Sequence, residues 1–160
     1  RYAGEINRLV KNAIEKTRRL ARGLCPVHLI SLGLEASLEE LADSTASIFN
    51  MICNFRCPRH IPIDDIALST HLYYIAKESI HNSIEHGKSS KIVLELLNNK
   101  GIVSLSILDD GVGIKDTTKV GGIGLKIMQY RARMIGASLR IESEPNGGTL
   151  VTCTFNLNKG

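Results

Sequence analysis

Two glycine clusters, each next to an apolar run, constrain this chain more than any other feature. The first cluster, Asp109 to Gly113, follows an alternating run from Ile102 to Leu108 that predicts a β-strand. The second, Gly121 to Gly124, opens a helical pattern. A carboxylate at a strand end can accept a hydrogen bond from the amino group of a flat ligand, and glycine lets backbone approach that ligand. A glycine-rich loop at a helix N-terminus presents free amides to phosphates. The two clusters together predict a nucleotide site.

The common nucleotide motifs do not describe this site. A dinucleotide-binding fingerprint needs a helix directly after its glycines, whereas a polar loop over residues 114–119 follows the first cluster. The Gly-Lys-Ser/Thr sequence of a P-loop does not occur. Each cluster taken alone is also compatible with a plain turn. A nucleotide site in this chain is therefore of another kind.

An amphipathic helix is predicted upstream, from Leu72 to His86. Glu78 and Asn82 are four residues apart and share one face of it. A carboxylate and a carboxamide one turn apart suit a hydrated Mg²⁺, which takes oxygen ligands and keeps several of its waters. The alternative is a solvated polar stripe on a surface helix.

Together these segments resemble one family. The resemblance rests on four boxes in order: Glu78-x-x-x-Asn82, Asp109-x-Gly111-x-Gly113, Gly122-x-Gly124-Leu125 and Gly147-Gly148-Thr149. They are similar to the N-box and glycine boxes of the ATP-binding domain of sensor histidine kinases, within the GHKL superfamily that includes gyrase, Hsp90 and MutL. The run from Thr17 to Pro26, followed by Leu32-Gly33-Leu34, resembles the second dimerisation helix and linker of nitrate-sensor-type histidine kinases. The resemblance extends over residues 10–157.

The resemblance implies ATP and Mg²⁺ as cofactors and a role for each matching residue. Asp109 would accept a hydrogen bond from the adenine amino group, and Thr149 would support that carboxylate directly or through water. Asn82 would ligate Mg²⁺, and Glu78 would orient or deprotonate the nucleophile. The remaining positions would bind the nucleotide through close approach of the backbone or through free amides. These positions are Gly111, Gly113, Gly122, Gly124 and Leu125.

The resemblance also implies the reaction: transfer of the γ-phosphate of ATP to a histidine, for relay to a response regulator. The family's acceptor histidine precedes an acidic residue on a dimerisation helix. This chain has five histidines, and none of them precedes an acidic residue. They are His28, His60, His71, His81 and His86. We therefore expect the acceptor outside this chain, and a homodimer through the dimerisation helices of the full-length protein. The alternatives are a GHKL-type ATPase and a degenerate nucleotide-binding or dimerisation module without catalysis.

One position departs from the family pattern. Many relatives carry a basic residue three positions after the N-box asparagine, whereas this chain has Glu85. Lys88 or Lys126 would have to compensate beside a triphosphate. We interpret His81 and His86 as structural members of the helix.

Composition excludes several other classes. The formal charge is +4, and the basic residues of the first 22 positions are mixed with Glu5 and Glu15, which favours a solvated helix face over nucleic-acid binding. Cys53 and Cys57 could begin a zinc site, but no second pair completes it. The sequence has no signal peptide and no apolar run near 18 residues. We expect a C-terminal fragment in the cytoplasm, with any membrane contact made by segments outside it.

Pattern and turn residues predict the order of elements and an α/β two-layer sandwich, the Bergerat fold, with helices on one face of a mixed sheet. We expect a long N-terminal helix over 4–24, a helix from a capping box at Ser37 to Ile48, and a strand over 48–53. A short helix from Asp64 or Asp65 precedes the N-box helix. Further strands are predicted over 91–97, 102–108, 138–143 and 149–157, with a helix over 124–135 and a mobile lid over 115–120. The predicted domains are a partial dimerisation helix (1–25), a linker (26–36) and an ATP-binding domain (37–160).

Overall fold

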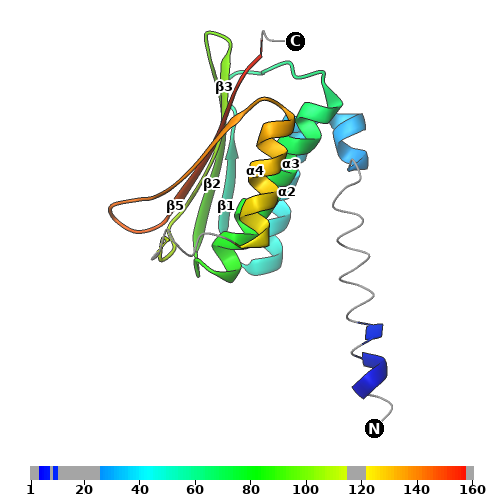
Figure 1. The fold of residues 1–160 in the computed structure, drawn as a ribbon, viewed down its shortest axis with the longest axis vertical. Coiled ribbons are helices and arrows are strands. Elements are labelled where there is room, and N and C mark those ends of the chain that lie inside the picture. Colours follow the sequence, from blue (N-terminus) through cyan, green and yellow to red (C-terminus); the bar gives the residue numbers. More distant parts are fainter. Residues whose placement is uncertain (1–3, 8, 11–25, 115–121, 158–160) are drawn as a thin grey trace.

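A five-stranded sheet organises the part of the chain that the structure describes (Figure 1). The structure is a computed structural model, and it describes residues 4–7, 9–10, 26–114 and 122–157. The strands lie in the order β1-β2-β3-β5-β4. They are β1 (Ile52–Arg56), β2 (Lys91–Asn99), β3 (Ile102–Asp109), β4 (Ser138–Ser143) and β5 (Thr149–Asn156). Because β1 is parallel to β2 and all other pairs are antiparallel, the sheet is mixed, as predicted.

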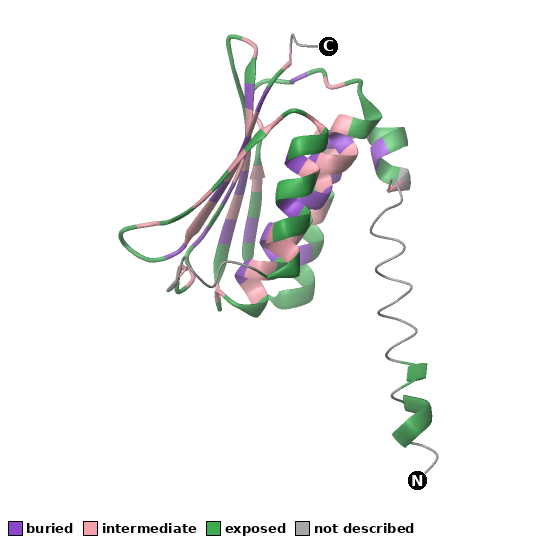
Figure 2. Ribbon diagram, in the orientation of Figure 1, coloured by how far each residue is buried: buried purple, intermediate pink, exposed green. Residues whose placement is uncertain are grey.

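Three helices cover one face of this sheet: α2 (Val27–Phe49), α3 (Ile66–Glu85) and α4 (Ile123–Met134). Alternation along the strands explains the core between the two layers. On β2 the side chains of Ile92, Leu94 and Leu96 are buried, and their neighbours are not. Figure 2 shows the buried residues gathered where the helices meet the sheet. The predicted two-layer α/β fold is confirmed.

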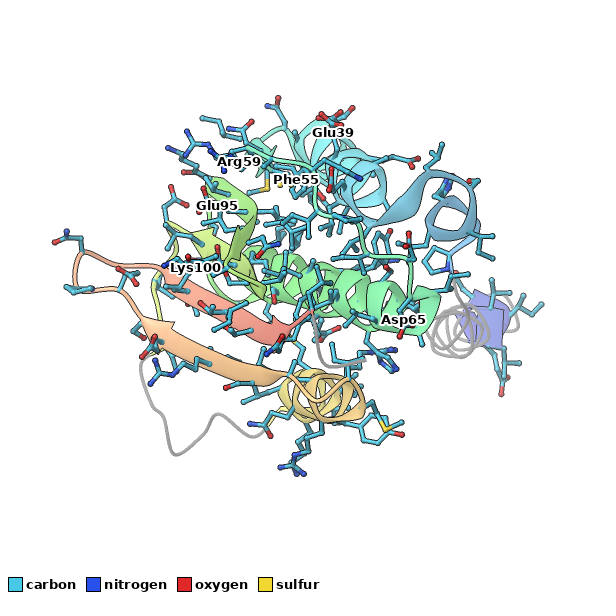
Figure 3. The ribbon with its side chains drawn as sticks, turned by 90° about the horizontal axis from the view of Figure 1, so that it is seen from above. Glu39, Phe55, Arg59, Asp65, Glu95 and Lys100 are labelled. Atoms are coloured by element: carbon cyan, nitrogen blue, oxygen red, sulfur yellow. The ribbon has the colours of Figure 1, made fainter. Side chains whose placement is uncertain are left out.

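The helix that carries the N-box begins where its capping residue predicts. The side chain of Asp65, labelled in Figure 3, accepts a 3.0 Å hydrogen bond from the amide of Leu68. This bond satisfies one of the free amides of the first turn. The predicted division into a short helix and a separate N-box helix is wrong, since α3 is continuous from Ile66 to Glu85.

The predicted helix start at Ser37 is also wrong, because helical residues precede it. Helix α2 begins at Val27, with Pro26 at its N-cap, because proline is compatible with a first helical turn. Gly33 interrupts it with φ 82° and ψ 177°, and Nδ1 of His28 lies 3.4 Å from Oε2 of Glu40 across the break. The hydroxyl of Ser37 does not cap a helix start but donates to the carbonyl oxygen of Gly33. The domain boundaries at 25 and 36 stay predictions.

Strand β1 starts later than predicted. Ile48 and Phe49 are the last residues of α2 and are exposed, and Asn50 ends the helix in the left-handed conformation. The apolar pair therefore ends a helix instead of opening a strand, and β1 runs from Ile52 to Arg56.

Parts of two predictions lie outside the described residues. Of the long helix over 4–24 only residues 4–7 and 9–10 are described, and they are helical and exposed. The proposed lid over 115–120 is not described. Within the described residues, no helix is long and apolar enough to cross a membrane.

Candidate nucleotide site

A cavity of about 560 Å³ lies between α3, the N-terminal end of α4 and the adjoining ends of β3 and β5. Every site residue predicted from the sequence lines it except Gly111; these are Glu78, Asn82, Asp109, Gly113, Gly122, Gly124, Leu125 and Thr149. Apolar side chains form much of the remaining wall, among them Met128, Ile141 and Val151. An apolar enclosure with a few convergent polar groups is the usual character of a small-molecule site.

Asp109 is a buried carboxylate in the wall of this cavity. It is the last residue of β3 and is 6% exposed. Its Oδ1 accepts hydrogen bonds from the amides of Gly111 (2.8 Å) and Thr149 (3.1 Å). Its Oδ2 accepts one from the hydroxyl of Ser83 on α3, at 2.7 Å. The carboxylate is therefore held from three segments of the chain.

The hydrogen-bond count at Asp109 leaves one acceptor position open. An ionised carboxylate has about four lone-pair positions, two on each oxygen. The two amides occupy Oδ1, and Ser83 occupies half of Oδ2. The Ser83 oxygen also lies 2.9 Å from the carbonyl oxygen of Ser79, but a hydroxyl carries one proton and the charged carboxylate is the stronger acceptor. The remaining position of Oδ2 suits a donor on a ligand.

Two glycines are needed where the β3–α4 loop passes its neighbours. A Cβ on Gly111 would collide with the carbonyl oxygen of Gly87, which accepts a hydrogen bond from the amide of Val112 at 2.9 Å. A Cβ on Gly148 would collide with the carbonyl oxygen of Asp109, and Gly148 has φ +103°. Only glycine fits such positions without displacing backbone. The Asp109 loop is thus packed against the end of α3 on one side and the β4–β5 hairpin on the other.

The structure refines the expected role of Thr149. The bond to Asp109 comes from the backbone amide of Thr149, at 3.1 Å. That amide follows Gly148, whose close approach to Asp109 puts it in reach. The predicted support for the carboxylate is thus supplied by the main chain in this geometry.

Glu78 and Asn82 both line the cavity from α3, so the structure brings this predicted pair together. The carboxylate of Glu78 lies against Gly124 in the first turn of α4, in space that a Cβ would otherwise fill. A helix N-terminus favours negative charge, whether from this carboxylate or from a phosphate. Gly122, the N-cap of α4, has open space where a Cβ would be.

The basic side chains that line the cavity are histidines, and the two lysines considered from the sequence do not line it. His81 and His86 are exposed and line the cavity, and their interpretation as structural members of the helix stays a prediction. His81 lies on α3, and His86 is its C-cap. Glu85, Lys88 and Lys126 are exposed and are not among the lining residues.

Ser83, whose hydroxyl bonds Asp109, was not among the site residues predicted from the sequence. The pattern gave a sign of it, because a hydroxyl on a buried face needs a partner. Asp110, which shares the first glycine box, has a structural role instead. It binds the hydroxyl of Ser90 at 2.6 Å and the amides of Ser90 and Lys91, and these bonds, the Ser90 hydroxyl first, lower its pKa.

Asn82 offers the kind of oxygen that Mg²⁺ binds, and Glu78 lies one turn before it on the same face. The donor set therefore fits a hydrated Mg²⁺ held between the protein and phosphates. Among the described residues, no group of three His, Cys, Asp or Glu side chains is placed to hold a metal by itself.

Comparison with known proteins agrees with this geometry. The family described as "Histidine kinase-, DNA gyrase B-, and HSP90-like ATPase" matches residues 67–159, more than half of the chain. The chain belongs to this family.

Individual proteins that are similar to this chain give a narrower comparison than the family does. Sensor protein VraS of Staphylococcus saprophyticus is 29% identical over 96% of this chain and 44% of its own length, and VraS of Staphylococcus aureus (strain COL) matches over the same shares. The chain thus spans less than half the length of these relatives.

Among solved structures, the histidine kinase domain of the Erythrobacter litoralis EL346 blue-light activated kinase has a TM-score of 0.66 at 20% identity, covering 79% of this chain and 62% of that one. The ATP-binding domain of PrrB from Mycobacterium tuberculosis also has 0.66, at 19% identity, covering 77% and 93%. At these identities the likeness shows the fold.

Proposed function

We propose that this chain is the ATP-binding catalytic domain of a two-component sensor histidine kinase. In this proposal it transfers the γ-phosphate of ATP to a histidine outside the chain. The observation that carries the proposal is the state of Asp109: a buried carboxylate with three donors in place and one acceptor position directed to a cavity. An exocyclic amino group such as that of adenine meets that requirement. Family membership and the similarity to proteins named sensor proteins support the same function.

The remaining lining residues divide between base and phosphates. Gly113 and the apolar side chains of Met128, Ile141 and Val151 line the same cavity as Asp109 and would face the base. Gly111 would keep its backbone against Gly87 so that the loop passes the base closely. At the other side, the first turn of α4, with Gly122, Gly124 and Leu125, would present free amides to the phosphates.

Asn82 would hold Mg²⁺, which supplies charge neutralisation to the phosphoryl oxygens when bound. Glu78 lies beside Asn82 and against Gly124, where it would orient the attacking histidine. Histidine is largely neutral near pH 7 and needs less deprotonation than water. Orientation and charge stabilisation are therefore expected to supply most of the rate enhancement.

The finer identity is part of the proposal. The Thr17 to Pro26 segment and the following Leu32-Gly33-Leu34 resemble nitrate-sensor-type kinases, and we assign the chain to that type. The full-length protein would dimerise through its dimerisation helices and pass the phosphoryl group to a response regulator. The similarity to two proteins named sensor proteins supports a sensor protein in general, and the assignment to the nitrate-sensor type rests on the sequence resemblance.

Transfer in trans tests the proposal. The chain is incubated with Mg²⁺ and ATP labelled in the γ-phosphate, alone and with a separate polypeptide that carries a dimerisation helix with a histidine before an acidic residue. The chain alone should gain no acid-labile phosphate, and the added polypeptide should be labelled. Steady release of inorganic phosphate without an acceptor would instead indicate an ATPase. Failure to bind labelled ATP at all would indicate a non-catalytic module. Acid-labile phosphate on a histidine of the chain itself would contradict the external acceptor.

A further inference from the structure

A second cavity, of about 450 Å³, lies at the end of the sheet opposite the nucleotide cavity. In the β2–β3 register, Ile92 pairs with Asp109 at the nucleotide end, and Asn99 pairs with Ile102 at the other end. The second cavity is formed there, between the turn of this hairpin and the loop over Pro58 to Ile61 that follows β1. Among the described residues, the two cavities share no lining residue.

Arg59 and Lys100, both labelled in Figure 3, bring positive charge to the second cavity. Both side chains are exposed, and neither has an acidic partner among the described residues. No aspartate or glutamate of the described chain lines this cavity. Glu95, on the adjoining part of β2, is paired in register with Arg56 and lines a separate cavity with it. Because a hollow lined by charges of one sign concentrates ions of the opposite sign, the second cavity favours an anion.

Apolar side chains line the same cavity. Ile61 and Leu96 are buried, and Leu97 is 39% exposed. The volume is that of a small-molecule site and is larger than an inorganic anion alone needs. Apolar side chains and cations in one hollow suit a ligand that has an apolar body and an anionic group.

Hydrogen bonds hold the walls of this cavity in place. Oε1 of Glu35 on α2 accepts from the amide of Ile61 at 2.7 Å and lies 3.0 Å from Nδ1 of His60. The amide of Leu157, just after β5, donates to the carbonyl oxygen of Gly101 at 2.8 Å. Walls that are already fixed lose little conformational entropy when a ligand binds.

Lys100 is the less expected of the two cations. With Gly101 it forms the two-residue turn of the β2–β3 hairpin, and the two residues have φ 52° and 90°. Asparagine, aspartate or glycine is preferred at the first position of such a turn, because other side chains are disfavoured in the left-handed conformation. The turn itself therefore does not explain a lysine at this position, whereas an anion beside it does.

We propose that the second cavity binds a small organic anion, namely a carboxylate or phosphate on a compact apolar body. The Arg59 guanidinium would hold the anionic group with paired hydrogen bonds, and Lys100 would add a point charge. Ile61, Leu96 and Leu97 would contact the apolar body. The inference goes beyond the proposed kinase function and does not depend on it.

Titrations followed by amide NMR test this site. The chain is titrated with benzoate, phenyl phosphate, inorganic phosphate and benzyl alcohol, at low and high salt. Benzoate or phenyl phosphate should shift the amides of residues 97–101, with a dissociation constant that rises with salt because the cations are exposed. Inorganic phosphate lacks the apolar body and benzyl alcohol lacks the charge, so each should bind at least about 5-fold more weakly.

Three results of these titrations would overturn the inference. They are unshifted amides at 97–101 with both aromatic anions, equal binding of inorganic phosphate or benzyl alcohol, and shifts confined to residues 122–125. The last result would place the anion in the nucleotide cavity.

Variants separate the role of charge from that of folding. Lys100→Asn removes a cation and places a preferred residue in the turn, so it should keep or raise the unfolding midpoint while weakening the aromatic anion about 2- to 5-fold. Arg59→Gln should weaken the anion by a similar factor. Lys88→Asn is the matched control, because Lys88 is also exposed, has φ 55° and does not line the second cavity. Parent-like affinity in Lys100→Asn or Arg59→Gln, or the same loss in Lys88→Asn, would contradict the assignment of this cavity.

Discussion

The hydroxyl of Ser83 donates a 2.7 Å hydrogen bond to Oδ2 of Asp109, and so connects α3 to the end of β3 inside the nucleotide cavity. Both residues are buried. Because the Gly111 and Thr149 amides occupy the other oxygen, this single bond sets the direction of the free acceptor position.

Ser83→Ala should destabilise the fold and weaken nucleotide binding together. It leaves a buried carboxylate oxygen short of a donor, which costs about 1–3 kcal/mol. Urea unfolding measures the first effect and calorimetry with ATP the second. Ser44→Ala is the matched control, because Ser44 lies on the exposed face of α2 and bonds only its own helix in the described contacts. A Ser83→Ala protein as stable as the control would show that the bond contributes nothing.

Asn82→Ala should act through the metal. The side chain lines the cavity one turn after Glu78, where its oxygen can reach a hydrated Mg²⁺. We expect the variant to lose most of the Mg²⁺-dependent gain in ATP affinity while ATP in EDTA binds nearly as to the parent. Calorimetric titrations of ATP with Mg²⁺ and with EDTA measure the two affinities. An equal loss with and without Mg²⁺ would mean that Asn82 contributes to the fold or contacts the nucleotide itself.

Substitution by alanine should lower the stability of the fold much more at Gly111 than at Gly122, two of the predicted nucleotide-binding glycines. At Gly111 a Cβ would collide with the Gly87 backbone, and overpacking of this kind costs about 1–3 kcal/mol. At Gly122 the same atom meets nothing, so only the weaker N-cap preference of alanine should lower the stability, by less than the collision at Gly111 does, and the retained amide should keep nucleotide affinity nearly unchanged. Unfolding midpoints of Gly111→Ala and Gly122→Ala measure the difference. Equal midpoints would contradict the packing of the Asp109 loop against α3.

Stability should fall as the pH drops below about 6.5 in a way that depends on His71. Burial first, and then the charge of Arg131, lower its pKa from 6.5, while Asp65 acts weakly in the other direction. The unfolded chain therefore takes up a proton at a higher pH than the folded chain, so the contribution of His71 is complete above 6.5 and is lost as the pH falls toward the lowered pKa. His71→Asn keeps an acceptor for Arg131 without titrating. This variant should reduce the pH dependence of the free energy of unfolding below pH 6.5. An unchanged pH dependence would show that other groups cause the effect.

Much of the fold was predictable because its strands have clean patterns. The β2–β3 hairpin follows from two alternating runs around a turn, and the structure places positive φ at Lys100 and Gly101 there. The start of α3 followed from one capping aspartate. The start of α2 did not, because Pro26 is compatible both with ending one helix and with beginning the next, and only packing decides between them.

The cavity was predictable in its residue types but not in its contacts. Periodicity placed Glu78 and Asn82 on one face, and strand alternation placed Asp109 at a strand end. The partner of Asp109 on α3 depends on how helix and sheet meet, and no local pattern specifies that. The same holds for Gly148, whose necessity arises from the backbone of Asp109 across a hairpin. The contact between Arg131 and Tyr74 is likewise a product of the α3–α4 packing.

The most direct test of the account is calorimetric titration of ATP into Asp109→Asn. An asparagine can still accept from Gly111 and Thr149, but its amide nitrogen then replaces Oδ2 and directs a donor at the amino group of the base. This mispairing should cost about 1–3 kcal/mol, roughly 5- to 150-fold in affinity. Asp110→Asn is the control, since Asp110 bonds Ser90 and Lys91 away from the cavity, and it should bind ATP as the parent does. If Asp109→Asn also binds ATP with the parent affinity while remaining folded, the assignment of this cavity to the adenine base is wrong.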